Sequence, residues 1–387
     1  MSGVASVPRD VILSLCFVTW EDAHRRGMHF PPDRLIAALI ADPRVGRLIV
    51  VDPFRDRVRT LAKRALGRTL DPVETIDDLA VGHLRPLRSG RRDPTDIPAL
   101  ERQFGRYDRL VEHSAGAAGL ERPVVITTSP LAAGFASFDW AGPVTFYAWD
   151  DWAVHPTYRP WWPAFDEVHR RIRERGTRMC AVSQAILDRA RPSGPALVIP
   201  NGVDPPEWTG DALAPAWFGE LPAPRLLYAG TLDSRIDTDM VVRTAERFPE
   251  GSIVLVGLIA DADHLAPLRD LPNVHIHPAV PREQITGLIR ASDACLVPHA
   301  RTDLTLAMSP LKLYEYVAGG RPVAATDLPP MRGISPRVVL TAAGGDFPAA
   351  VERALELGPA PEPERLEFVR ANSWAGRHAA LLDLAFG

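Results

Sequence analysis

A short stretch in the second half of the chain carries residue types that suit an anionic ligand. Ser309 is a favourable N-cap, and Pro310 stands where its missing N–H costs nothing, so a helix is expected to begin here. The first amides of that helix, at Leu311 and Lys312, would point at an anion, and Lys312 adds a positive charge. Glu315 follows one turn later on the same side, where its carboxylate would bind a ribose diol. These residues predict a nucleoside diphosphate site.

The same stretch also fits an ordinary amphipathic helix, because Leu311, Leu313 and Val317 recur at inward-facing spacing and so short a motif is weak alone. Gly319 and Gly320 are expected to end the helix. The apolar residues 321–326 then predict the next buried strand.

The whole segment resembles the donor-site helix of family 4 retaining glycosyltransferases of the GT-B fold, also called glycosyl transferases group 1. The family pattern P-x-K-x-x-E-x-x-A-x-G-x-P-V-V-A-T is matched at Pro310, Lys312, Glu315, Ala318, Gly320, Pro322, Val323, Ala325 and Thr326. The resemblance implies an α/β GT-B fold, with two Rossmann-like domains facing across a cleft and a C-terminal helix that crosses back to the first. It also implies transfer of a sugar from a nucleotide diphosphate-sugar to a hydroxyl, with retention of anomeric configuration.

Residues 228–232, Tyr-Ala-Gly-Thr-Leu, are similar to the family's strand and glycine loop, where Gly230 lets the diphosphate approach the backbone. Thr231 stands where relatives often carry Arg. The nearest cation, Arg235, is therefore assigned to the diphosphate, with a solvated loop arginine as the alternative.

One family feature is missing. Relatives carry a second glutamate eight residues before the donor-site one, and that position here is Ala307. The loop 301–308, with Thr305, is expected to substitute for it near the donor. Residues 199–204, Ile-Pro-Asn-Gly-Val-Asp, are similar to the family's end of the first domain.

Polar residues follow a predicted strand in the first half as well. Asp150 and Asp151 come directly after the strand at 143–147, so they should emerge at the carboxyl edge of a parallel sheet, where such sheets bind ligands. Together with His155 they are candidates for orienting the acceptor hydroxyl, or for acting as its base if configuration inverts. The alternatives are a helix cap for one aspartate and a loop role for His155.

Acceptor contact is expected from residues after the first strand, which resemble a loop that touches both substrates in many relatives: Trp20, His24, Arg26 and His29. A solvated turn is the alternative for them. Trp149 and Trp152 would offer stacking faces to a sugar or an apolar aglycone, or else form partly buried core.

Apolar runs alternate with helical patterns throughout, which is typical of parallel βαβ units. Strands are predicted at 11–17, 47–51, 123–127, 143–147, 179–182, 196–199, 226–230, 252–257, 274–277 and 294–298, and the clearest helices at 31–40 and 183–190. The expected organisation is an acceptor-binding domain at 1–204, a Pro/Trp/Gly-rich linker at 205–224, a nucleotide-sugar-binding domain at 225–365, and a terminal helix within 366–387, capped by Ser373, that packs on the first domain.

Composition fits a two-domain globular enzyme. At 387 residues the chain can bury two cores, and a formal net charge of -4 gives no reason to expect nucleic acid. Its three cysteines lie in apolar runs, which favours buried thiols in a reducing compartment, here the cytoplasm, and disfavours a metal site. No run approaches the ~20 apolar residues of a membrane helix, while peripheral membrane contact stays open.

The hypothesis is a cytoplasmic, metal-independent glycosyltransferase without a cofactor, whose co-substrate is a UDP- or GDP-sugar and whose acceptor is a glycan, a lipid-linked sugar or a small natural product. Two alternatives remain. A nucleotide-sugar 2-epimerase of the same fold would alter the donor without an acceptor, and a non-catalytic nucleotide- or glycan-binding relative would bind without turnover. A dinucleotide dehydrogenase is disfavoured, because no G-x-G-x-x-G follows the first strand.

Overall fold

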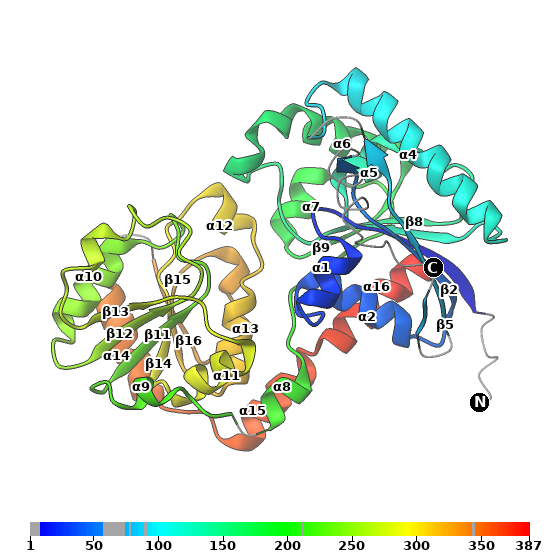
Figure 1. Cartoon of the computed structure of the whole chain (residues 1–387). Helices are drawn as coiled ribbons and strands as arrows, with labels where there is room; N and C mark the ends of the chain where they lie inside the picture. The colour runs from blue at the N-terminus through cyan, green and yellow to red at the C-terminus, as the bar shows by residue number, and fades with distance from the viewer. Residues whose placement is uncertain (1–7, 57–73, 77–78, 89–91, 211, 343–344) are drawn as a thin grey trace, which may run out of the picture. The chain divides into compact units, whose positions relative to one another are not determined.

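The structure, a computed structural model, describes residues 8–56, 74–76, 79–88, 92–210, 212–342 and 345–387. The chain folds into two compact units (Figure 1). The first unit comprises Met1–Pro200 and His378–Gly387, and the second comprises Asn201–Arg377. Each unit is built on a mainly parallel sheet covered by helices. In the described residues no helix is long and apolar enough to cross a membrane.

The first unit contains an eight-stranded sheet in the order β10-β9-β8-β7-β1-β2-β5-β4. Its strands are β1 (Arg9–Ser14), β2 (Val45–Val51), β4 (Glu74–Ile76), β5 (Leu79–Leu84), β7 (Val124–Thr127), β8 (Val144–Ala148), β9 (Arg178–Ala181) and β10 (Ala196–Val198). All neighbours pair in parallel except β4, which is antiparallel to β5. A separate two-stranded sheet joins β3 (Arg55–Asp56) to β6 (Leu87–Arg88).

The central strands of this sheet are apolar on both faces. Residues 11–13 of β1 and 124–126 of β7 are buried on every side, as expected where helices cover both faces of a parallel sheet. The helices of the unit are α1 (Trp20–Arg25), α2 (Pro31–Ala41), α4 (Ile97–Ala117), α5 (Pro130–Phe135), the 3₁₀ helix η1 (Pro156–Trp161), α6 (Trp162–Arg175) and α7 (Gln184–Ala190).

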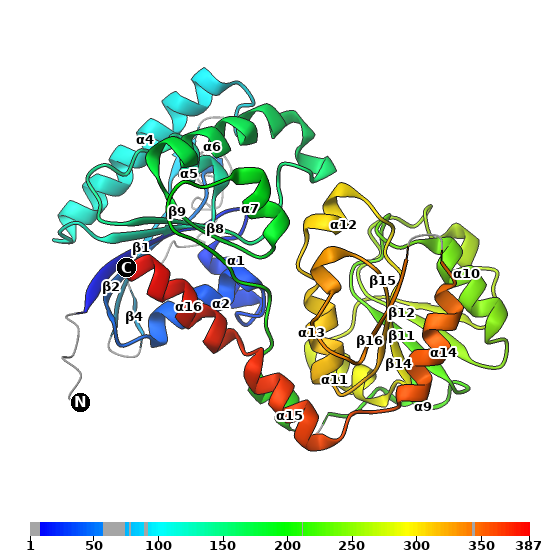
Figure 2. The same cartoon turned by 180° about the vertical axis from the view of Figure 1, so that it is seen from behind.

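The second unit contains a six-stranded, all-parallel sheet in the order β13-β12-β11-β14-β15-β16 (Figure 2). Its strands are β11 (Arg225–Ala229), β12 (Ser252–Val256), β13 (Val274–His277), β14 (Ala294–Val297), β15 (Val323–Thr326) and β16 (Val338–Thr341). Its helices are α8 (Pro205–Thr209), α9 (Ala216–Gly219), α10 (Thr238–Arg247), η2 (Ala266–Leu268), α11 (Arg282–Ala291), α12 (Asp303–Ala307), α13 (Leu311–Ala318), η3 (Pro329–Met331), α14 (Phe347–Leu357) and α15 (Glu362–Ala371).

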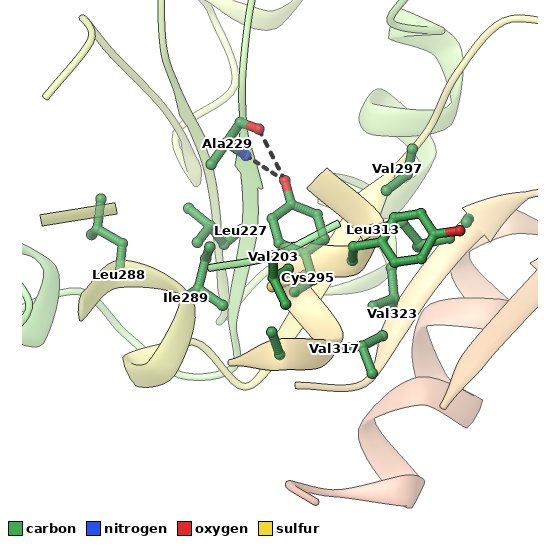
Figure 3. Close-up of a cluster of buried hydrophobic side chains, with 14 of the residues drawn as sticks. Val203, Leu227, Ala229, Leu288, Ile289, Cys295, Val297, Leu313, Val317 and Val323 are labelled. Carbon is green, nitrogen blue, oxygen red and sulfur yellow. Dashed lines mark hydrogen bonds between the residues drawn. The ribbon is translucent and has the colours of Figure 1, made fainter. Parts of the chain in front are cut away.

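Successive side chains of these strands enter two different cores. Leu227 and Ala229 of β11 join the core beneath α13, which Figure 3 shows, whereas Leu226 and Tyr228 point into the core beneath α10 and α14. Tyr316 of α13 ties the helix to the strand, because its hydroxyl accepts a hydrogen bond from the Ala229 amide at 2.7 Å and donates to the Ala229 carbonyl at 3.2 Å. The second half of α13 is thereby tied to the end of β11.

Residues 205–224 were expected to form a linker, and the structure corrects this. They contain α8 and α9, and both Trp208 and Phe218 are fully buried in the core of the second unit. The prolines and glycines that suggested a linker instead punctuate two short helices, whose large apolar side chains pack against the sheet.

The terminal segment is also divided differently from the prediction. A helix expected within 366–387 is preceded by α15, which begins at Glu362, and α16 then spans Trp374–Phe386. The Ser373 hydroxyl accepts a hydrogen bond from the Gly376 amide at 3.3 Å, so the predicted cap is confirmed. From His378 onward the helix belongs to the first unit, where it lies beside α2 and where Arg178 donates to the Ala385 carbonyl at 2.9 Å.

Candidate functional site

The end of strand β11 approaches helix α13 with no space for a side chain. Gly230 has φ +150°, and a Cβ at this residue would lie 2.8 Å from Lys312 Nζ. Gly257 follows β12 in the same conformation, and a Cβ there would overlap the Gly230 carbonyl oxygen. Glycine is therefore required at both strand ends, and the Lys312 ammonium lies directly beside the backbone of residue 230.

Lys312 is surrounded by an aromatic ring and an imidazole. Its ammonium donates to the Tyr228 hydroxyl at 2.5 Å and lies 3.9 Å from the centre of the same ring, a cation–π distance. His299 Nε2 is 3.5 Å away. Burial, followed by the charge of Arg235, lowers the pKa of Lys312 to about 7. An anion bound at this position would raise the pKa of Lys312 again and so favour the protonated ammonium.

His299 completes this group from the residue after Pro298, just beyond β14. It is fully buried, and its Nε2 lies 3.3 Å from the Tyr228 hydroxyl. Burial, then Lys312 and Arg235, hold the pKa of His299 well below its ordinary value, so the ring is neutral at physiological pH. Among the described residues its Nδ1 has no hydrogen-bond partner.

Arg235 lies in the loop between β11 and α10, near Lys312. Its guanidinium forms an ion pair with Asp233 at 2.8 Å, and its carbonyl accepts from the Ala300 amide at 2.8 Å. Burial alone would raise the pKa of Asp233, but the hydrogen bonds from Arg235 lower it. Asp233 therefore neutralises part of the charge of Arg235. The Lys312 ammonium nearby has no such hydrogen-bonded carboxylate among the described residues.

The helix start differs by one residue from the prediction. Pro310 is the N-cap of α13, and Ser309 does not cap it. Instead, the Ser309 hydroxyl accepts from the Asn201 amide at 3.0 Å, and the Asn201 side chain donates to the Ser309 carbonyl at 2.9 Å. Ser309 thus anchors the segment before the helix. The amides of Leu311 and Lys312 lie in the first turn, where the helix offers no partner.

Glu315, the predicted ribose ligand, is one of two carboxylates that share an arginine. Arg282 Nη2 lies 2.6 Å from Glu315 and 2.7 Å from Glu207 of α8. Burial would lower the pKa of Arg282, but the two carboxylates raise it above its ordinary value. The guanidinium also lies 5.9 Å from the centre of the Trp208 ring. Glu315 is therefore held in a fixed direction by a neighbour that the sequence did not reveal.

Thr305 is used within its own helix rather than presented to a ligand. It is 1% exposed, its hydroxyl donates to the Ala300 carbonyl at 2.7 Å, and it forms a capping box with Thr302. The Thr305 hydroxyl is thus bonded within its own segment, and the substitution of loop 301–308 for the missing glutamate stays a prediction. Ala307 is buried at the end of the same short helix. Thr231 directly follows Gly230, and its carbonyl accepts a hydrogen bond from the Tyr228 hydroxyl at 3.2 Å.

In the first unit the predicted polar residues do follow β8. Asp151 is 3% exposed, and it accepts from Arg189 at 3.0 Å and from the Ala153 amide at 3.2 Å. Asp150 is partly exposed and accepts from the Asp151 amide at 2.8 Å. Neither aspartate caps the following 3₁₀ helix, because that position belongs to His155, whose Nδ1 accepts from the Thr157 amide at 3.3 Å.

Most of the predicted acceptor residues in the loop and helix after β1 make contacts within the protein. Trp20 is buried, and its amide donates to Asp52 at 2.9 Å. Arg26 makes a bidentate ion pair with the buried Asp33, with a closest contact of 2.8 Å. His24 Nδ1 lies 3.0 Å from the Trp20 carbonyl, and the exposed His29 lies 3.5 Å from Arg34. Arg26 is therefore held by a structural ion pair.

Trp149 and Trp152 belong to an aromatic cluster. Their rings pack edge to face with centres 4.9 Å apart, and Trp152 also contacts Phe17 at 4.7 Å and Tyr158 at 5.2 Å. Trp152 is buried behind Phe17, so Phe17, which the sequence did not single out, presents the accessible ring.

Three contributors to the second-unit site were missed by sequence reasoning: Tyr228, His299 and Arg282. Tyr228 could have been found, since it is the first residue of the matched segment 228–232 and precedes Gly230 by two residues. His299 follows a predicted strand end, as ligand residues in open sheets do, which is a weak signal. Nothing in the sequence links Arg282 to Glu315, because the pairing depends on tertiary packing.

No protein-family model matches the chain. Over 135 residues it is 30% identical to TuaH of Bacillus subtilis (strain 168), a protein named as a glycosyltransferase of teichuronic acid biosynthesis. The match covers 33% of this chain and 34% of the relative, so the chain spans about a third of the length of the curated relative it matches.

Solved structures of trehalose-6-phosphate synthases resemble nearly the whole chain. The Burkholderia multivorans enzyme has a TM-score of 0.66 at 13% identity, with 98% of each chain covered. The E. coli structure bound with UDP-2-fluoro glucose has a TM-score of 0.66 at 11% identity, covering 97% of this chain and 99% of that one. The Burkholderia xenovorans enzyme in complex with glucose-6-phosphate has a TM-score of 0.62 at 11% identity, covering 97% and 100%. This likeness establishes the fold, and the predicted GT-B architecture of two Rossmann-like α/β units is confirmed.

Proposed function

We propose that this protein is a glycosyltransferase that moves a sugar from a nucleotide diphosphate-sugar to an acceptor hydroxyl. The observation that carries the proposal is the Lys312 ammonium, which lies partly buried beside Gly230 at the first turn of α13. In the described part of the chain no carboxylate is hydrogen-bonded to it. A partly buried cation next to the first amides of a helix and a glycine backbone suits a diphosphate.

The proposed chemistry is stabilisation of a departing diphosphate. As the bond from the anomeric carbon to the diphosphate oxygen breaks, negative charge grows on that oxygen and positive charge on the sugar ring. Lys312, Arg235 and the amides of Leu311 and Lys312 would stabilise the leaving group without reorganising, which is the usual source of the largest catalytic term. Tyr228 and neutral His299 would position the ammonium.

The donor is proposed to be a UDP-sugar, with the diphosphate at Gly230 and Lys312 and the ribose diol at Glu315. A UDP-sugar analogue is bound in the E. coli structure of the same fold, which supports this choice. Arg282 would act as a positioning residue, since it directs the Glu315 carboxylate. The names of the relative and of the structural neighbours describe glycosyl transfer or trehalose-phosphate synthesis, which supports transfer over 2-epimerisation.

The acceptor is proposed to bind the first unit, and transfer is proposed to retain anomeric configuration without a metal ion. Retention rests on the family resemblance. It also suits the structural use of Asp151, which is ion-paired to Arg189 rather than presented as a base. Product analysis by NMR tests retention, and activity in the presence of EDTA tests metal independence. The free, buried cysteines suit the reducing cytoplasm.

Calorimetric titration with UDP, GDP, TDP and ADP tests the donor site. One nucleotide should bind, and Lys312→Met should weaken it by about tenfold to a hundredfold, as expected for one charge-assisted hydrogen bond. Arg243→Met, which removes an exposed cation from α10 of the same unit, is the matched control and should bind normally. Failure of all four nucleotides to bind folded protein would overturn the proposal.

A further inference from the structure

The first unit contains a cavity of about 400 Å³ whose lining includes none of the residues predicted to contact the acceptor. It lies where β1 and β7 end, bounded by residues 15–17 after β1 and by residues 129–132 at the start of α5. This is the carboxyl edge of a parallel sheet, where open α/β folds bind ligands. The volume falls within the range of small-molecule sites, roughly 300–1,000 Å³.

Seven of the twenty residues that line this cavity are aromatic, Tyr158 among them. Six of its rings come from five separate segments of the first unit: Phe17, Phe54, Phe104, Tyr107, Trp161 and Phe165. Two of the polar groups among them are already used, since the Tyr107 hydroxyl is hydrogen-bonded to Ser14 at 2.7 Å and Trp161 Nε1 donates to the Pro94 carbonyl at 2.9 Å. The rings therefore present apolar surface, which suits an apolar ligand group.

The charged side chains at the cavity are largely neutralised by one another. Arg88 forms an ion pair with Asp93, and Asp22 is held by Thr19 and by Arg25 at 2.9 Å. Arg55 lies 3.6 Å from the buried Asp52. Arg92 also lines the cavity and is exposed, so a cation stands at the rim beside the apolar wall.

Phe17 gives an independent sign that the cavity is used. Its φ is +62°, a left-handed conformation that is strained for a bulky residue. Its ring is 49% exposed, although it packs at 4.7 Å on Trp152 and at 4.8 Å on Tyr158. Strained residues of this kind concentrate at ligand sites. The strain places an accessible aromatic ring at the cavity rather than in the core.

We propose that this cavity binds the aglycone of the acceptor, and that the acceptor is a hydroxyl compound carrying a neutral, ring-sized apolar group. The apolar group enters between Phe17 and the aromatic wall, while the hydroxyl-bearing end stays at the polar rim. This inference rests on the proposed glycosyltransferase function and narrows its acceptor from sugars in general to aryl-substituted compounds. Phe17 is the specificity-determining contact.

Calorimetry with two ligands and three proteins tests the inference. The probes are para-nitrophenyl glucoside and methyl glucoside, which share the sugar and differ in the ring. The intact protein should bind the aryl compound about tenfold more tightly or better, as burial of one ring predicts. Phe17→Gly should abolish most of this preference. Its thermal midpoint should stay within about 3 °C, because relief of the strained φ offsets the lost contacts.

Arg191→Gly is the matched control. Arg191 is an exposed residue of the same unit with φ +49°, so the substitution relieves similar strain away from the cavity. It should keep the aryl preference in full. UDP binding is titrated in parallel on every protein, which separates this inference from the proposed function.

Equal affinity for the two glucosides in protein that binds UDP would overturn the inference and leave the donor proposal intact. An aryl preference that survives Phe17→Gly would place the ring elsewhere and likewise overturn it. Binding of the aryl compound without any nucleotide binding would overturn the acceptor role of the cavity, because no donor would then be available.

Discussion

Glu315 is held at 2.6 Å by Arg282, which also binds Glu207 at 2.7 Å, so one guanidinium neutralises two poorly exposed carboxylates. Removing the arginine leaves both carboxylates close together without this counter-ion. Arg282→Gln is therefore expected to lower the free energy of unfolding by about 1–3 kcal/mol, below the range for fully buried pairs because Arg282 is 27% exposed. Urea denaturation measures this.

Glu315→Gln provides the comparison for Arg282→Gln. It should destabilise the protein by less than about 1 kcal/mol, since Glu207 still pairs with Arg282. It should nevertheless weaken nucleotide binding if the carboxylate holds the ribose diol. A large stability loss with unchanged nucleotide affinity would show that Glu315 is a structural residue only.

Nucleotide binding should depend on pH through Lys312. Its pKa is about 7 in the folded protein against an ordinary lysine value of 10.5, so between these values the unfolded chain binds one more proton. The contribution of this group to unfolding free energy therefore rises with pH across that window. A bound diphosphate reverses the shift, so binding above pH 7 must take up a proton.

We expect UDP affinity to fall above about pH 7.5, by up to tenfold per pH unit. Titrations in buffers of different ionisation enthalpy should report proton uptake. In Lys312→Arg the side chain stays charged, so its UDP affinity should change less with pH, even if that affinity is lower than in the wild type. A wild-type affinity that is constant to pH 9, without proton uptake, would contradict the assigned role of the ammonium.

Gly230→Ala should impair nucleotide binding more than folding. The new methyl group would stand 2.8 Å from Lys312 Nζ, so the flexible lysine must move away from its position beside the backbone. UDP affinity should fall by at least about tenfold. Gly333→Ala is the control, because Gly333 has φ +73° but no atom within 4 Å of the place a Cβ would take; it should show only the strain of the substitution.

Asp151→Ala should act mainly on stability. The carboxylate is buried, and its loss leaves Arg189 without this partner and the Ala153 amide without its acceptor. The free energy of unfolding should drop by about 1–3 kcal/mol, whereas the exposed Asp188→Ala on α7 should change it by less than about 0.5 kcal/mol. A stable Asp151→Ala protein that has lost all turnover would instead indicate a catalytic base.

The sheets and the centre of the candidate site could be predicted from the sequence because they rest on local patterns. Most strands of both sheets, and the end of α13 at Gly319, follow from apolar runs and glycine positions. The closeness of Gly230 and Lys312 follows from the family pattern and the parallel topology. The edge strand β16 and the long helix α4 were not predicted.

The remaining errors concern partners distant in the sequence. Ser309 looks like a helix cap, but its hydroxyl is used by Asn201, 108 residues away. Trp208 and Phe218 look like linker residues until the sheet provides a surface that buries them. The strained φ of Phe17 likewise depends on packing against Trp152 and Tyr158. Local propensity does not contain this information.

The chain enters and leaves the second unit at the same place. The Val203 amide donates to the Asn372 carbonyl at 2.9 Å, and the Trp374 amide donates to the Val203 carbonyl at 2.9 Å. Residues 201–377 thus form an insertion whose ends meet. The corresponding module of a relative could replace it as a single cassette with two junctions, provided that the second junction keeps the helical register of α16.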